Sequence, residues 1–285
     1  MRFKHSQFKV CIILCLVLIP AVKALAKDQI PVAAPMTTDL AGKSGNIAVE
    51  SVLRILCPSK NRSGTGFLHK SGNLITAGHV VEGCTTNEIL VISALGKIIH
   101  VSDIIIDEDL DLALLTMGER SQSSALSICK NDKISIGAQV STWGFPSGYN
   151  GRTSLLSSGY ISGIDHVKTK NNKVVGKLVV NAAFNSGNSG GPLIEIENGT
   201  VIGVVSSKLA PMPQYIEGAL KALKEAKYGL MFEKTLPDGS KESLSQAQVV
   251  EEILQYLRSQ TQLVIGYAVL VKDLRAFLKV NGINP

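Results

Sequence analysis

Between residues 51 and 206 the chain is a succession of short apolar runs, each separated from the next by Gly, Asn, Ser or Asp. The runs are brief, closely spaced and rich in β-branched residues, which is typical of a β-sandwich or barrel and not of βαβ units. They fall into two groups, which predict two successive antiparallel barrels. The expected strands are 51–56, 65–69, 73–76, 89–93, 97–106 and 111–117, followed by 139–143, 154–164, 173–181, 192–197 and 200–206.

A different pattern follows this β region. Apolar residues recur at helical spacing in 214–227 and again in 243–259. A further strand is expected at 262–270, and a C-terminal helix within 271–282. The sequence thus predicts an all-β fold with helical additions, in which a helical pair inserted at 210–261 interrupts a β pattern that resumes afterwards.

The N-terminal residues have the three parts of a secretory signal peptide. Residues 1–9 are positively charged, residues 10–19 form an unbroken apolar run, and Ala24-Leu-Ala26 fits the small-residue cleavage pattern. The apolar run is shorter than the roughly 20 residues that a membrane helix needs, so we expect a cleaved signal peptide at 1–26. The protein would then be exported, periplasmic or secreted, with no stable membrane span. The alternative is an uncleaved membrane anchor.

Composition narrows the range of partners. Hydrophobic residues make up 45% and charged residues 18% of the chain, as in an ordinary globular protein. The formal charge of +6 falls to +2 once the four basic residues of the leader are left out. No basic stripe interleaved with aromatic residues is present, so nucleic acid is not an expected partner. We expect a flexible segment at 27–47, a first barrel at 48–125 and a second barrel at 126–285.

The stretch Asn185-Ser-Gly-Asn-Ser-Gly-Gly-Pro is the strongest candidate for a reactive site. Its glycines allow positive φ angles and let peptide N–H groups face a shared cavity. Ser189 at its centre could attack a carbonyl, while the N–H groups of Gly187 and Ser189 would stabilise the resulting oxyanion. The alternative for this stretch alone is a glycine-rich hairpin turn.

A histidine and a carboxylate with suitable contexts lie earlier in the chain. His79, in Thr-Ala-Gly-His, comes just past a short strand, where an imidazole could accept the serine proton; a structural histidine is the alternative. Asp111 is followed directly by Leu112 and further buried residues, so its carboxylate needs hydrogen bonds, which a histidine would supply. Asp109 is the second choice. No His/Cys/Asp cluster has zinc-like spacing, so neither a metal nor an organic cofactor is expected.

The order His79, Asp111, Ser189, with Thr-Ala-Gly-His, Asp-Leu-Ala-Leu and Gly-Asn-Ser-Gly-Gly-Pro around them, resembles the chymotrypsin/trypsin clan of serine proteases. Ser63-Gly-Thr-Gly-Phe and Val140-Ser-Thr-Trp-Gly-Phe-Pro are similar to segments of its bacterial HtrA (Deg) branch. The resemblance covers residues 49–283 apart from the insertion. It implies two six-stranded antiparallel barrels with a Ser-His-Asp triad at their junction, and a serine endopeptidase that cleaves protein or peptide substrates through an acyl-enzyme.

The resemblance also suggests a substrate site. A strand at 204–208 would hold the substrate backbone by β-augmentation, with Val205, Ser206 and Ser207 in contact. Ala183 occupies the position where trypsin-like enzymes place a carboxylate for Lys or Arg, and Phe184 follows it. An apolar pocket of this kind predicts cleavage after small or medium apolar residues such as Val, Ala or Leu.

Two departures limit what carries over from the resemblance. Asn188 replaces the aspartate that pairs with a new N-terminus in activated trypsin-like zymogens, so that activation route is not expected. The PDZ domains usual in the HtrA branch are not expected either, because the chain stops at Pro285.

In many trypsin-like enzymes a disulfide crosses the histidine loop. The resemblance therefore implies a bridge between Cys57 and Cys84, which would leave Cys129 free; three reduced thiols are the alternative.

Two other functions remain open at this stage. One is a non-catalytic binding module on the protease fold; the other is a protease kept latent by the helical insertion until a regulatory partner binds there. The insertion could equally be a structural elaboration of a barrel face, a lid, or a docking surface.

Overall fold

The computed structural model describes residues 45–118, 124–169, 171–208, 214–236, 239–260 and 265–285. The expected signal peptide and nearly all of the segment 27–47 lie outside these ranges. The chain divides into two compact units, one containing residues 37–213 and 255–285, the other residues 214–254. Of the helices in the described ranges, none combines the length and the hydropathy that a membrane crossing requires.

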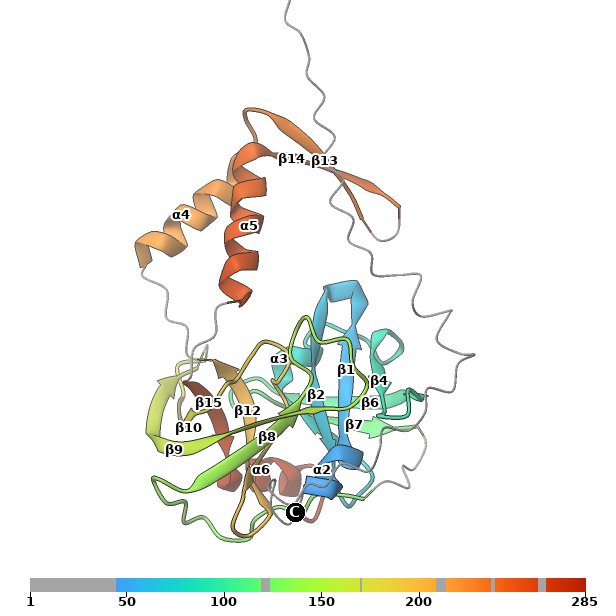
Figure 1. Ribbon diagram of the computed structural model, residues 1–285, viewed down its shortest axis with the longest axis vertical. Helices are drawn as coiled ribbons and strands as arrows, with labels where there is room; N and C mark the ends of the chain where they lie inside the picture. The colour runs from blue at the N-terminus through green and yellow to red at the C-terminus, as the bar shows by residue number, and fades with distance from the viewer. Residues whose placement is uncertain (1–44, 119–123, 170, 209–213, 237–238, 261–264) are drawn as a thin grey trace, which may run out of the picture. The chain divides into compact units, whose positions relative to one another are not determined.

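The first lobe of the larger unit is a seven-stranded antiparallel sheet in the order β5-β4-β1-β2-β3-β7-β6 (Figure 1). The sequence predicted six strands here, but the expected strand 97–106 is divided at His100, whose carbonyl accepts a hydrogen bond from Gly118 N–H. The strands are β1 Val52–Cys57, β2 Arg62–Leu68, β3 Leu74–Thr76, β4 Leu90–Ile92, β5 Ile98–Ile99, β6 Val101–Asp107 and β7 Leu112–Met117.

The second lobe is a closed six-stranded barrel in the order β10-β15-β12-β11-β8-β9. All of its strand pairs are antiparallel, and β15 returns between β10 and β12 although it is the last strand of the chain. The strands are β8 Gln139–Gly144, β9 Leu155–Lys168, β10 Val174–Asn181, β11 Pro192–Glu195, β12 Thr200–Lys208 and β15 Gly266–Leu270. The fold is therefore mostly β, with two antiparallel barrels of the chymotrypsin-like arrangement.

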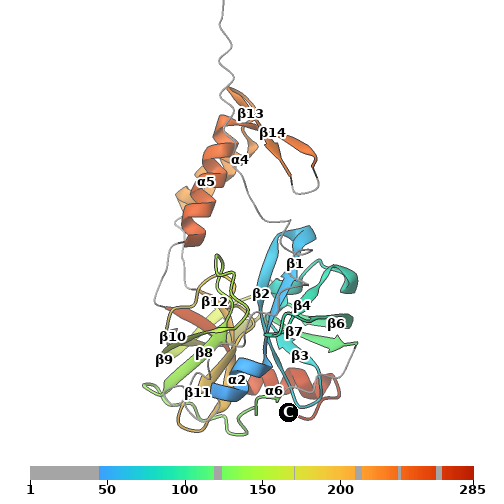
Figure 2. The same ribbon diagram turned by 45° about the vertical axis from the view of Figure 1, so that its right-hand side comes forward.

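One hydrophobic core spans the two lobes. Phe67 and Leu112 of the first lobe pack in the same buried cluster as Trp143 and Val204 of the second. Helix α6 (Val271–Val280) belongs to this core through Leu274, and it lies below both lobes together with α2 (Gly45–Ser51) (Figures 1 and 2). This shared core fixes the seam between the lobes, where the candidate site lies.

The smaller unit differs from the expected helical pair. Helices α4 (Gln214–Glu225) and α5 (Gln246–Gln260) are present, but a hairpin of β13 (Met231–Thr235) and β14 (Lys241–Ser245) lies between them in the chain. The predicted second helix began at residue 243. It begins later because Ser245 caps α5: its backbone N–H donates to Gln248 Oε1, and its hydroxyl accepts from Gln248 N–H.

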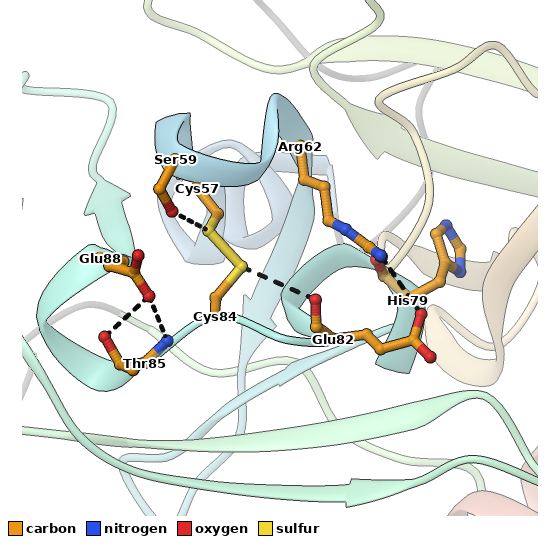
Figure 3. The surroundings of a disulfide bond; sticks show 8 residues. All are labelled: Cys57, Ser59, Arg62, His79, Glu82, Cys84, Thr85 and Glu88. Atoms are coloured by element: carbon orange, nitrogen blue, oxygen red, sulfur yellow. Dashed lines mark hydrogen bonds and ion pairs between the residues drawn. A yellow bond between two sulfur atoms is a disulfide. The ribbon is translucent and has the colours of Figure 1, made fainter.

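A disulfide joins Cys57, at the end of β1, to Cys84, shortly after helix α3 (Gly78–Val81), and Cys129 is free (Figure 3). The bridge closes the loop that contains β2, β3 and α3. Its place next to α3 means that it restrains the segment carrying His79 in the unfolded chain as well as in the folded one.

We expect the double variant Cys57→Ser/Cys84→Ser to lose about 3 kcal/mol of unfolding free energy, because opening a loop of this size returns conformational entropy to the unfolded chain. Urea unfolding of both proteins measures the difference. Cys129→Ser is the matched control and should change stability little. Equal stabilities for the double variant and the control would show that the bridge does not form in the protein.

Candidate active site

His79 owes its position to the pairing of β3 with β7. Thr76 at the end of β3 lies opposite Ala113, so the chain that leaves β3 faces the turn just before β7. Helix α3 starts at Gly78, where an added Cβ would lie 3.4 Å from Asp111 Oδ1. Helix α3 thus lies next to Asp111, and His79 in its first turn lines the cleft.

Asp111 is held in the turn before β7 with a φ of 60°, a left-handed conformation that is uncommon for residues other than glycine. Its Oδ1 accepts hydrogen bonds from the backbone N–H of His79 at 2.9 Å and from the ring Nδ1–H at 3.0 Å. Its Oδ2 also lies 3.0 Å from the ring Nδ1 and accepts a further hydrogen bond from the Ser206 hydroxyl at 2.5 Å. The alternative carboxylate, Asp109, is bonded instead to Asn171 Nδ2 at 3.1 Å.

These contacts keep Asp111 ionised. Burial alone would raise the pKa of the Asp111 carboxyl, but the hydrogen bond and charge of the His79 ring, the Ser206 hydroxyl and the His79 backbone N–H together hold it below its ordinary value. A carboxylate that remains charged at neutral pH can orient the imidazole and stabilise its protonated form.

Ser189 lies between two glycines with positive φ, Gly187 at 93° and Gly190 at 86°. The position after the serine has no room for a side chain, since a Cβ on Gly190 would lie 2.1 Å from the carbonyl oxygen of Thr65. The Ser189 hydroxyl donates to the carbonyl of Ser206 at 3.0 Å. In this conformation it is therefore bonded to β12 and not to the imidazole.

His79, Gly187 and Ser189 line one cleft of about 300 Å³. The His79 side chain is 44% exposed there, whereas Asp111 lies behind it and is 24% exposed. The remaining lining residues are mostly polar: Asn61, Arg62, Ser63, Val80, Ser147 and Ser186. The structure thus brings the three predicted catalytic residues to one site.

The peptide between Ser186 and Gly187 has a defined orientation. The Ser186 carbonyl accepts a hydrogen bond from Ser147 N–H at 2.7 Å. The peptides of the described residues are trans, so the Gly187 N–H points away from this carbonyl. Within the described part of the chain, neither the Gly187 N–H nor the Ser189 N–H has a hydrogen-bond acceptor, which leaves both as donors for a ligand.

The predicted substrate-pocket residues lie deeper than the cleft itself. Phe184 is only 1% exposed and packs against Gly266 in the barrel core. Ala183 is half-buried, and its carbonyl accepts a hydrogen bond from Asn188 Nδ2 at 3.3 Å. Neither residue is among those that line the cleft.

The strand expected to bind substrate is β12, and it supports the Ser189 loop directly. Val205 accepts a hydrogen bond from Gly190 N–H at 2.7 Å and donates one to the Gly191 carbonyl at 2.9 Å. In the described structure β12 pairs with β11 only through residues 200–204, whereas Ser207 pairs with Tyr267 of β15. The end of β12 therefore extends beyond β11.

Two residues contribute to the site in ways that the sequence did not indicate. Ser206 was expected only to contact substrate, yet its hydroxyl binds Asp111 and its carbonyl binds Ser189. Arg62 donates to the His79 carbonyl and forms an ion pair with Glu82 at 3.3 Å (Figure 3). Ser206 and Asp111 are 95 residues apart in the chain. Among the described residues, no cluster of His, Cys, Asp or Glu could hold a metal ion.

The two-barrel fold, with a serine from one lobe facing a histidine of the other, is that of the chymotrypsin-like class of proteins. Residues 64–204 match the trypsin-like peptidase domain, so the chain contains a domain of this family.

Relatives and solved structures agree with this assignment. The chain is 34% identical over 155 residues to the magnetosome formation protease MamE of Magnetospirillum gryphiswaldense. This alignment covers 52% of this chain and 19% of MamE. It is 31% identical over 144 residues to a probable periplasmic DegP-like serine endoprotease of Halomonas elongata, covering 50% of this chain and 29% of the relative. The chain therefore spans less than a third of the length of these relatives.

Among solved structures, the active form of the Rv3671c protease from M. tuberculosis superposes with a TM-score of 0.52 at 22% identity. The match covers 79% of this chain and 88% of that one. At this identity the similarity concerns the fold alone.

Proposed function

We propose that this protein is a serine endopeptidase that hydrolyses peptide bonds through Ser189, His79 and Asp111. The observation that carries the proposal is that His79, hydrogen-bonded to Asp111, lines the same cleft as Ser189. The names of its relatives, which include a DegP-like serine endoprotease, support the same activity.

In the first step, Ser189 would act as the nucleophile. Its hydroxyl, which donates to the Ser206 carbonyl in this conformation, must turn to the imidazole before it can react. Asp111 accepts the His79 Nδ1–H, so Nε2 carries a lone pair and can take the serine proton. The Ser189 oxygen then bonds to the substrate carbonyl carbon, and the carbonyl π electrons move to its oxygen.

In the second step, the N–H groups of Gly187 and Ser189 would bind the oxyanion. Protonated His79 returns its proton to the leaving amine as the carbon–nitrogen bond breaks, which leaves an acyl-enzyme on Ser189. A water molecule, deprotonated by His79, then bonds to the acyl carbon. The carbon–oxygen bond to Ser189 breaks, and His79 returns the proton to the Ser189 oxygen as the acid product leaves. The two unused N–H donors described above support this role for the loop.

For the substrate, we propose peptides whose P1 residue is small or medium and apolar, next to Ala183 and Phe184. Neither Ala183 nor Phe184 carries a charge, so a basic P1 side chain beside them would find no partner. The backbone of Val205, Ser206 and Ser207 would hold the peptide by β-augmentation. A peptide panel that varies only P1 tests this: preference for Val, Ala or Leu is expected, and preference for Arg would contradict it.

The setting proposed for this activity is outside the cytoplasm, in the periplasm or the medium, after removal of residues 1–26. It rests on the signal-peptide pattern of the sequence and on a relative that is named periplasmic.

A second candidate function is that of a latent protease, relieved by a regulatory partner that binds residues 214–254. The observation that favours it is the set of exposed apolar side chains on α5, such as Ile253 at 52% and Leu254 at 43%. Soluble proteins seldom leave such side chains grouped without a partner.

Labelling with a fluorophosphonate tests both candidates, because this probe reacts only with an activated serine. The active protease should be labelled at Ser189 with the insertion present. A protein labelled only after deletion of residues 210–261 would be a latent protease. Absence of labelling in both forms would favour a non-catalytic binding module.

A further inference from the structure

Thr65, in β2 of the first lobe, is fully buried at 0% exposure and lies against the Ser189 loop of the second lobe. Its backbone N–H donates to the Ser189 carbonyl at 2.8 Å. Its hydroxyl donates to the Gly187 carbonyl at 2.6 Å and accepts from Phe145 N–H at 3.1 Å. One side chain thus connects β2 with two separate loops of the other lobe.

The Thr65 hydroxyl is itself well fixed. The Thr65 carbonyl accepts a hydrogen bond from the Thr76 hydroxyl at 2.7 Å, which ties β2 to the end of β3. The hydroxyl has one donor and one acceptor partner in a site without exposure to solvent. Such a group keeps a single orientation, since any rotation would leave a buried polar group unpaired.

The Gly187 carbonyl is the partner of greatest consequence. Gly187 has a φ of 93°, and without a Cβ its flanking peptides could rotate at small steric cost. Two hydrogen bonds prevent this: Ser147 N–H holds the Ser186 carbonyl, and the Thr65 hydroxyl holds the Gly187 carbonyl. Together they fix the two peptides on either side of Gly187.

We propose that Thr65 is a positioning residue for the oxyanion-binding loop, and that its hydroxyl keeps the N–H groups of Gly187 and Ser189 directed into the cleft. The proposal rests on the function proposed above. Thr65 does not itself line the cleft, so it acts through the loop and not on the substrate. Loss of its hydroxyl would leave the Gly187 carbonyl and the Phe145 N–H unpaired and allow the loop to reorient.

The test compares Thr65→Val with Thr65→Ser on a peptide substrate. Valine has the shape of threonine without the hydroxyl, and we expect kcat to fall by about tenfold to a hundredfold with little change in KM, somewhat less than the loss of a whole oxyanion donor. Serine retains the hydroxyl and should stay within about threefold of the wild type. A peptide boronate, which mimics the tetrahedral intermediate, should bind Thr65→Val more weakly by a similar factor.

Thr142→Val is the matched control. Thr142 is also buried, on β8, and its hydroxyl has no hydrogen-bond partner among the described residues. Its replacement should leave kcat unchanged. Equal losses in Thr65→Val and Thr142→Val, or a change in KM alone, would overturn the proposal, because a general packing defect would then explain the result.

If Thr65→Val does not fold, Thr65→Ala is compared with Thr65→Ser, since that pair also differs only in the hydroxyl. Equal kcat values in the pair would overturn the proposal. Fluorophosphonate labelling separates this failure from failure of the proposed function. A labelled wild type with an equally active Thr65→Val variant contradicts only the role of Thr65, whereas an unlabelled wild type contradicts the protease activity itself.

Discussion

Replacing Ser189 with alanine should lower kcat for an unfolded protein or peptide substrate by about a millionfold, the loss typical when a serine protease loses its nucleophile. The substitution removes the oxygen that would form the proposed acyl-enzyme, while the His79–Asp111 pair would remain in place. Any remaining acceleration over the uncatalysed reaction in water would come only from the oxyanion donors and from substrate binding. Mass spectrometry of the cleavage products, with the wild type in parallel, measures the difference and maps the cut sites.

The control for this experiment is Ser158→Ala, because Ser158 is an exposed serine on β9, away from the cleft. It should cleave the same sites at the wild-type rate. Retention of the cut pattern by Ser189→Ala would show that another residue, or a contaminating protease, is responsible. Equal unfolding midpoints for the two variants would exclude a loss of fold as the cause.

The strand pattern and the contexts of His79, Asp111 and Ser189 were predictable because each depends on residues close together in the chain. Alternating and continuous apolar runs indicate strands, and a glycine-rich turn indicates a loop with free N–H groups. The second lobe agrees with this pattern strand by strand, as a closed six-stranded barrel.

The contacts that organise the site could not be predicted in the same way. The hydroxyl of Thr65 meets Gly187 across 122 residues of sequence, and Ser206 meets Asp111 across 95. Both contacts depend on the register of the strands and on the packing of one lobe against the other. Thr65 stands within Ser63-Gly-Thr-Gly-Phe, but the motif does not reveal the partner of its side chain.

The hairpin in the insertion was missed for a different physical reason. Residues 231–235 and 241–245 are mostly exposed, so neither strand carries a strong apolar pattern. The turn at Leu236-Pro-Asp-Gly-Ser is a clear signal, but it is equally compatible with a link between two helices. The segment forms a hairpin because β13 pairs with β14, and such pairing cannot be seen in a single sequence.

Replacing Asp111 with asparagine should lower kcat by about ten-thousandfold, because the ring of His79 would be held in the wrong tautomer. The Asp111 carboxylate now accepts both the backbone and the ring N–H of His79. In an asparagine the single oxygen can take the place of Oδ1 and accept from the backbone N–H, while the NH₂ group takes the place of Oδ2, 3.0 Å from Nδ1. Nδ1 then accepts a hydrogen bond, Nε2 carries the proton, and the imidazole cannot take the proton of Ser189.

The substitution is a clean test because asparagine tolerates the left-handed conformation that residue 111 adopts, with φ at 60°. We therefore expect the fold to be retained, which circular dichroism and the unfolding midpoint would verify. Asp109→Asn is the matched control, since Asp109 is bonded to Asn171 and not to His79; its kcat should stay within about threefold of the wild type, in the range of substitutions that touch no reacting group. A large loss in Asp109→Asn together with an active Asp111→Asn would assign the orienting carboxylate to residue 109, and with it a different geometry for the site.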